Sequence, residues 1–158
     1  KCAHDKNQHT VSVAIQPLLD DLFRAMLARY PHVTISSNER LALEHVRIKD
    51  GPETLYRILE NLLLNACEGD GVQGATEISI LIAPSSNGRT FIIEILDNGP
   101  GFPEELLEGP LPIFQTSKTD GTGLGLFTSE KLVESNGGIL QRRNREEGGA
   151  LVRIELPL

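Results

Sequence analysis

Two pairs of strand-like segments, each pair joined by a turn, constrain the fold of this sequence more than any other feature. Residues 77–82 and 90–96 carry isoleucine or phenylalanine at every second position, with a Pro-Ser-Ser-Asn-Gly turn between them. A period of two is typical of strands that bury one face. Residues 139–143 and 150–156 form a second pair around the segment 144–149. Because strands joined by short turns pair antiparallel, the sequence predicts two hairpins.

Three further segments, 16–30, 52–68 and 124–135, have the apolar periodicity of helices that bury one face. Short strands are expected at 32–36 and 45–49, where apolar residues alternate with polar ones. The helices can lie together on one face of the strands. The predicted fold class is therefore α+β, a two-layer α/β sandwich.

The length and charge of the chain limit its function. A chain of 158 residues suits one domain, which we expect at 11–158, with the polar residues 1–10 forming a linker or the end of a preceding helix. Because the first residue is lysine, we expect the chain to be part of a longer protein. The net charge of −7 argues against nucleic-acid binding, which depends on clustered lysine and arginine.

The apolar runs and the cysteines bear on location. No run of 18 apolar residues occurs, so we expect no membrane contact from this domain, while an anchor elsewhere in the parent protein stays open. Cys2 and Cys67 are far apart and lack metal-ligand spacing, which is typical of reduced thiols in a cytoplasmic protein. Cys67 is expected in the core.

The stretch GTGLGL, residues 121–126, places three glycines at alternate positions at the start of the third helix, with Lys118 three residues before the first. Glycine lets backbone N–H groups approach a ligand closely, and a helix N-terminus attracts anions, so phosphate is the expected ligand. A Walker loop would place its lysine after the glycines. A dinucleotide-binding fold would place a buried strand before them, whereas the preceding residues are polar.

One stripe of the helix 52–68 is polar and lies opposite its apolar face. At 100° per residue, Arg57, Asn65 and Glu68 fall within roughly 40° of the direction of Asn61. Such a stripe is usually a solvated face. Asparagine is a mediocre helix former, however, so two of them four residues apart suggest a function.

A third feature is Asp97, which ends a predicted strand and is followed by Gly99 and Gly101. Together the three motifs resemble the ATP-binding domain shared by DNA gyrase, the Hsp90 chaperones, sensor histidine kinases and MutL. NLLLNA at Asn61–Ala66 resembles its N box, DNGPGF at Asp97–Phe102 its G1 box and GTGLGL its G2 box. The resemblance covers residues 11–158. It implies the Bergerat ATP-binding fold, a mixed, mainly antiparallel sheet covered on one face by about three helices, with an ATP lid.

The resemblance implies a role for each motif. Asp97 would accept a hydrogen bond from the exocyclic amine of adenine, with Gly99 and Gly101 letting the base approach; its alternative role is an Asx-turn acceptor. Asn65 would supply an oxygen ligand to Mg²⁺, and Asn61 would support the ion directly or through water.

The glycine stretch would hold the β- and γ-phosphates through its backbone N–H groups, with Lys118 as a point charge. As an alternative, Lys118 is an exposed loop lysine. Phe114 would be the aromatic residue of the lid, residues 102–120, which we expect ATP to order. The remaining expected nucleotide contacts are Thr116, Ser117, Gly121, Thr122, Gly123, Leu124, Gly125 and Leu126.

The residue one helical turn before the metal asparagine indicates one branch of the family. ATP-hydrolysing members place a water-activating glutamate one turn before it, where this chain has Asn61, and Glu60 is rotated by about 100°. The resemblance therefore favours the catalytic domain of a sensor histidine kinase in two-component signal transduction, with Asn61, Asn65 and Lys118 as catalytic residues. The alternatives are a serine kinase of the anti-sigma-factor type and a degenerate nucleotide-binding scaffold. Glu68 departs from a common pattern that has a basic residue at its position.

The phosphoacceptor histidine is not expected in this chain. His4, His9, His32 and His45 lack the flanking pattern of the family's acceptor, and we interpret them as solvent or linker histidines. The γ-phosphoryl group would go to a histidine on the dimerisation domain of the same protein, and from there to a response regulator.

Overall fold

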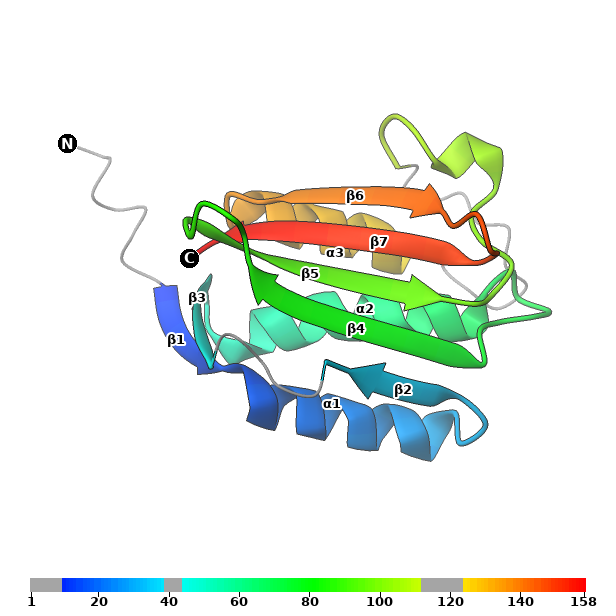
Figure 1. Cartoon of the computed structure of the whole chain (residues 1–158), viewed down its shortest axis with the longest axis horizontal. Coiled ribbons are helices and arrows are strands. Elements are labelled where there is room, and N and C mark those ends of the chain that lie inside the picture. The colour runs from blue at the N-terminus through cyan, green and yellow to red at the C-terminus, as the bar shows by residue number, and fades with distance from the viewer. Residues whose placement is uncertain (1–9, 39–43, 112–123) are drawn as a thin grey trace.

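The computed structural model describes residues 10–38, 44–111 and 124–158. Figure 1 shows its elements in chain order. They are β1 Thr10–Ala14, α1 Ile15–Arg29, β2 Thr34–Ser37, β3 His45–Lys49, α2 Pro52–Glu68, β4 Glu77–Pro84, β5 Thr90–Asp97, a short 3₁₀ helix Glu104–Leu106, α3 Leu124–Ser135, β6 Ile139–Asn144 and β7 Ala150–Pro157.

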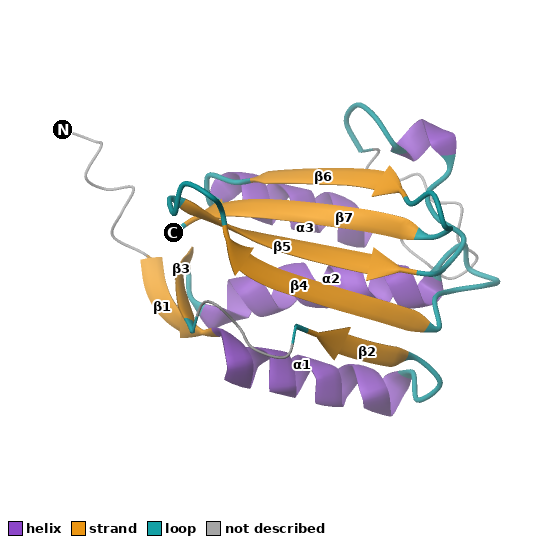
Figure 2. Ribbon diagram, in the orientation of Figure 1, coloured by secondary structure: helices purple, strands orange, loops and turns teal. Residues whose placement is uncertain are grey.

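The main sheet has five strands in the order β2-β4-β5-β7-β6. β4–β5 and β6–β7 are the two antiparallel hairpins that the sequence predicts. β5 also pairs antiparallel with β7, whereas β2 pairs parallel with β4. The helices α1, α2 and α3 lie on the same face of this sheet (Figure 2). The predicted two-layer α+β fold with a mixed, mainly antiparallel sheet is therefore confirmed.

One strand was not predicted. β1 pairs antiparallel with β3 in a separate two-stranded sheet, with Val13 opposite Val46. Its residues lie at the boundary where we expected linker to give way to domain. Val11 is exposed and Val13 is buried, which is the alternation of a strand. The signal extends over only five residues and runs directly into the stronger helical pattern of α1, so the sequence did not predict this strand.

The core lies between the helices and the sheet. The predicted apolar face of α2 is buried, and β4 and β5 bury every second residue. This agreement follows from geometry, because periods of 3.6 and 2.0 each place one set of side chains on one face. The largest fully buried side chain is Phe91 on β5.

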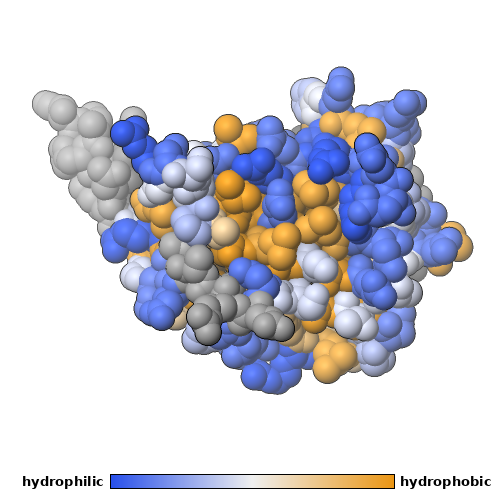
Figure 3. Space-filling view, viewed as in Figure 1, coloured by the Kyte–Doolittle hydropathy of each residue, from blue (hydrophilic) through white to orange (hydrophobic). Residues whose placement is uncertain are grey.

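No described helix covers the other face of the sheet (Figure 2). Figure 3 shows apolar side chains gathered on it, bordered by hydrophilic ones. Leu81 of β4 is 43% exposed and Ile139 of β6 is 60% exposed. Within residues 10–38, 44–111 and 124–158, no helix combines the length and the apolar character needed to cross a membrane.

Candidate functional site

Helices α2 and α3 meet through small side chains, and this contact brings two motifs together. A Cβ placed on Gly125 would lie 3.7 Å from Cβ of Asn61. One turn further along α3, the fully buried Ser129 donates a hydrogen bond from Oγ to the carbonyl oxygen of Ile58 at 3.1 Å. The start of α3 therefore lies against the asparagine stripe of α2.

Sequence analysis missed Ser129. The signal was the four-residue spacing of two small residues, Gly125 and Ser129, on an otherwise apolar helix. Small residues at this spacing form one face of a helix and let a neighbouring helix approach closely.

Asn61 and Asn65 both lie on the partly buried side of α2, whereas Arg57 of the same stripe is exposed. Leu126 is 5% exposed and packs in the core. Seven predicted site residues lie outside the described residues: Phe114, Thr116, Ser117, Lys118, Gly121, Thr122 and Gly123. Leu124 begins α3, as predicted, so the positive end of that helix lies at this residue.

Asp97 is buried at the end of β5, with 8% of its surface exposed. Its Oδ1 accepts hydrogen bonds from the backbone N–H groups of Gly99 at 2.8 Å and Ala150 at 3.2 Å. The first of these closes an Asx turn, which was the alternative role for this residue. Among the described residues no hydrogen bond reaches Oδ2, so the carboxylate can fill the structural role with one oxygen and bind a ligand with the other.

The electrostatic surroundings of Asp97 are mixed. Burial raises the pKa of its carboxyl group above the ordinary value. The N–H groups of Gly99 and Ala150 and the positive charge of Arg145 oppose this effect. Burial, helped by the charges of Glu68 and Asp97, also raises the pKa of the Cys67 thiol to about 11. The charge of Asp97 thus influences a side chain on the C-terminal half of α2.

Close packing favours glycine at Gly99, and both packing and backbone conformation favour it at Gly101. A Cβ on Gly99 would lie 3.2 Å from the backbone nitrogen of Ala75. Gly101 has φ +84°, and a Cβ there would lie 2.7 Å from Oδ1 of Asn144. The protein itself thus crowds this loop, in addition to any approach of a base.

The β6–β7 hairpin supplies residues that the motifs did not reveal. Asn144, Arg145 and Ala150 all form hydrogen bonds with the segment 97–102. The one sequence signal that could have indicated these residues as part of the site is their position beside a turn with two glycines. Local sequence cannot show that this turn packs on residues about 50 positions earlier.

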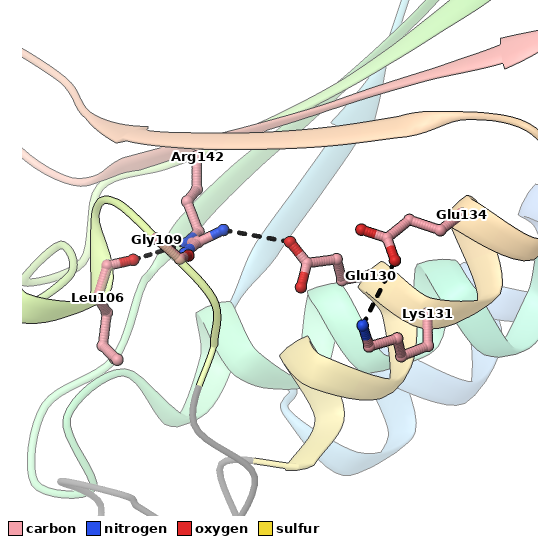
Figure 4. A network of polar contacts seen from close by, with 6 residues as sticks. All are labelled: Leu106, Gly109, Glu130, Lys131, Glu134 and Arg142. Carbon is pink, nitrogen blue, oxygen red and sulfur yellow. Dashed lines mark hydrogen bonds and ion pairs between the residues drawn. The ribbon is translucent and has the colours of Figure 1, made fainter.

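Arg142 holds the segment that leads away from Phe102 (Figure 4). Its Nε and Nη2 each donate to a carbonyl oxygen, of Leu106 and Gly109 respectively, at 2.6 Å. Nη1 forms an ion pair with Glu130 of α3 at 3.4 Å, and both side chains are largely buried. One guanidinium therefore joins β6, α3 and the segment 106–109.

Comparison with known proteins gives a consistent result. The profile of the family described as histidine kinase-, DNA gyrase B-, and HSP90-like ATPase matches residues 50–158. The chain is 34% identical over 131 residues to the sensor histidine kinase ZraS of Salmonella typhimurium, covering 83% of this chain and 27% of ZraS. It is 31% identical over 147 residues to the C4-dicarboxylate transport sensor protein DctB of Pseudomonas aeruginosa, covering 92% of this chain and 24% of DctB.

Solved structures agree. The catalytic domain of the histidine kinase ThkA superposes with a TM-score of 0.73 at 26% identity, covering 94% of this chain and 95% of that domain. The mycobacterial sensor histidine kinase MprB shares the fold, with a TM-score of 0.76 at 20% identity and coverage of 93% and 96%.

The chain belongs to the histidine kinase-, DNA gyrase B- and HSP90-like ATPase family. The relatives and solved domains that it resembles are named as sensor kinases and as the catalytic domain of a histidine kinase. The chain spans about a quarter of the length of the curated relatives it matches.

Proposed function

We propose that this domain binds ATP with Mg²⁺ and transfers the γ-phosphoryl group to a histidine on a dimerisation domain outside this chain. The observation that carries the proposal is Asp97, a buried carboxylate with one oxygen held by backbone N–H groups and the other without a protein partner among the described residues. A carboxylate oxygen of this kind accepts a hydrogen bond from the exocyclic amine of adenine. Guanine has a carbonyl oxygen at the same place, which cannot donate a hydrogen bond, so guanine is disfavoured.

A magnesium ion fits the asparagine stripe of α2 chemically. Mg²⁺ keeps several waters and takes few protein ligands beside phosphate oxygens, and an asparagine side chain supplies a hard oxygen without charge. Asn65 would hold the ion, with Asn61 one turn before it. Among the described residues no group of three or more His, Cys, Asp or Glu could form a metal site of another kind.

The absence of a base at Asn61 favours transfer over hydrolysis. An amide cannot deprotonate water, so the γ-phosphoryl group waits for a better nucleophile. In the transfer, a ring nitrogen of the acceptor histidine bonds to the γ-phosphorus, and the bond to the bridging oxygen of ADP breaks. Positioning and neutralisation of charge supply most of the catalysis, with Lys118 and the backbone of the glycine stretch holding the phosphates.

The remaining assignments follow from the kinase proposal. The relatives are named as sensor kinases, which supports a dimerisation and phosphotransfer domain in the same protein and a downstream response regulator as partners. We further propose a cytoplasmic location for the domain, because ATP is available there.

The test is nucleotide affinity in the wild type and in Asp97→Asn. Because Oδ1 already accepts two N–H groups, the asparagine oxygen would keep that place and its NH₂ group would face the amine of adenine. Two N–H donors, the side-chain amide and the adenine amine, would then face each other without an acceptor between them. We expect the wild type to bind ADP more tightly than GDP, and Asp97→Asn to lose ADP affinity by roughly ten- to a hundredfold.

The matched control is Asp20→Asn on the exposed side of α1, which makes the same chemical change and should bind as the wild type does. Calorimetry with magnesium present measures the affinity of the wild type for ADP and for GDP and the affinity of each variant for ADP. Equal wild-type affinities for ADP and GDP would rule out the assignment of Asp97.

A further inference from the structure

The turn between β6 and β7 contacts the Asp97 loop through two consecutive side chains. Asn144 accepts a hydrogen bond at Oδ1 from the N–H of Phe102 at 2.7 Å, and its Nδ2 donates to the carbonyl oxygen of Phe102 at 3.0 Å. Because one amide satisfies both backbone groups of Phe102, it fixes the direction of the chain where the glycine-containing loop ends.

Arg145 acts at the other end of the same loop. Its Nη1 donates to the carbonyl oxygen of Asp97 at 2.7 Å, while Nη2 pairs with Glu147 at 3.1 Å. Glu147 is exposed, so the pair mainly orients the guanidinium. A positive charge thus lies against the residue whose carboxylate is the proposed acceptor for adenine.

The backbone of the turn is equally close. Gly149 has φ +93°, and a Cβ on it would collide with the carbonyl oxygen of Asp97. Its neighbour Ala150 donates to Oδ1 of Asp97. The β6–β7 turn and the loop 97–102 are therefore packed tightly together, so that a shift of one displaces the other.

We propose that Asn144 and Arg145 are positioning residues for adenine recognition, with Asn144 fixing the loop 99–102 and Arg145 holding Asp97 so that its second oxygen meets the base. The inference rests on the proposed function. Neither residue need touch the nucleotide. Both act through Asp97 and the loop that follows it.

The charges around Asp97 provide a readout that a purely structural role would not change. Among the described residues, the titratable groups coupled to Asp97 are Arg145 from the hairpin and Cys67 from α2. The positive charge of Arg145 lowers the pKa of Asp97 against the effect of burial. Without this charge the pKa of Asp97 rises, and protonation of Asp97 on acidification begins at a higher pH.

The experiment measures the affinity of the whole domain for ADP with Mg²⁺ as a function of pH, in Arg145→Gln, Arg145→Lys and Asn144→Ala. Arg145→Gln should weaken binding by about tenfold, as the loss of a charge-assisted hydrogen bond predicts, and should move the acidic midpoint of the profile upward. Arg145→Lys keeps the charge but not the fork of donors, so the midpoint should stay while part of the affinity is lost. Asn144→Ala should weaken binding without moving the midpoint.

The control is Arg143→Gln, which removes the same charge from an exposed neighbour on β6 and should leave both quantities unchanged. Wild-type affinity and midpoint in folded Arg145→Gln would overturn the proposal, and an unmoved midpoint with weakened binding would reduce Arg145 to a structural role. If Arg145→Gln fails to fold, Asn144→Ala decides, since undiminished affinity there also overturns the proposal. A wild type that does not prefer ADP over GDP would instead overturn the proposed function itself.

Discussion

At the scale of single residues, Asp97 shows how one side chain serves fold and function together. Its Oδ1 closes the turn to Gly99 and joins the hairpin at Ala150. Burial raises its pKa, which means that the ionised form is less stable in the folded protein than in the unfolded chain. A site that holds such a charge for a ligand lowers the stability of the free protein.

This leads to a prediction about pH. Because the pKa of Asp97 is higher in the folded state, the native protein binds more protons than the unfolded chain just above the ordinary pKa of aspartate, about 4. The free energy of unfolding therefore falls as the pH rises through this window. We expect Asp97→Asn to match or exceed the wild-type stability at pH 7 and to lose that advantage below about pH 4.

Urea unfolding followed by circular dichroism at several pH values measures this difference. The wild type and Asp20→Asn serve as references, because Asp20 is exposed. A stability difference that does not change with pH would contradict the assignment.

At the scale of elements, side chains of the β6–β7 hairpin hold much of the segment between β5 and α3 in place. Arg145, Asn144 and Arg142 contact it in succession, at Asp97, at Phe102 and at residues 106–109. β6 and β7 pair antiparallel, and the turn between them lies at the end of the sheet where β5 ends (Figure 1). In the described part of this segment, residues 98–111, the short 3₁₀ helix is the one regular element, so these contacts from the hairpin fix much of its path.

The Arg142 network supplies a prediction on stability. Replacing Arg142 with glutamine leaves Glu130 largely buried without its ion-pair partner, and it removes charged donors from two carbonyl oxygens. We expect the free energy of unfolding to fall by about 2–4 kcal/mol. Glu130→Gln should lower the free energy of unfolding less, by about 1–2 kcal/mol, because Arg142 keeps its hydrogen bonds to both carbonyl oxygens.

Chemical denaturation measures both losses, with the exposed Arg143→Gln as the control that should stay within about 0.5 kcal/mol of the wild type. Equal stabilities of Arg142→Gln and Arg143→Gln would show that the network contributes nothing.

At the scale of the whole molecule, the net charge of −7 opposes the binding of a polyphosphate. The described site offers amide oxygens, backbone N–H groups and the positive end of α3. Beside Lys118, which lies outside the described residues, we expect the cation that accompanies the nucleotide to supply most of the neutralisation.

Metal removal tests this balance. We expect ATP affinity to fall by about tenfold or more when EDTA replaces Mg²⁺ at low salt. Part of the loss should be recovered at about 0.5 M salt, because screening weakens repulsion between the protein and the free nucleotide. Equal affinities with Mg²⁺ and with EDTA at low salt would argue against a bridging cation.

The sequence by itself determined the elements and the motifs. Periodicity placed α2 and α3 and both hairpins to within a few residues, because burial of one face repeats at a fixed spacing. The asparagine pair, Asp97 and the glycines identified the family, because each motif is a short run whose chemistry depends on neighbouring residues.

The tertiary structure alone decided how distant segments meet. The strand β1 and the parallel pairing of β2 with β4 depend on partners more than 30 residues away, and no local pattern encodes them. The same holds for Ser129 against α2 and for Asn144 and Arg145 against the Asp97 loop. Local sequence specifies which residues are polar or apolar and at what spacing, whereas the partner of a buried polar group is chosen only when the layers pack.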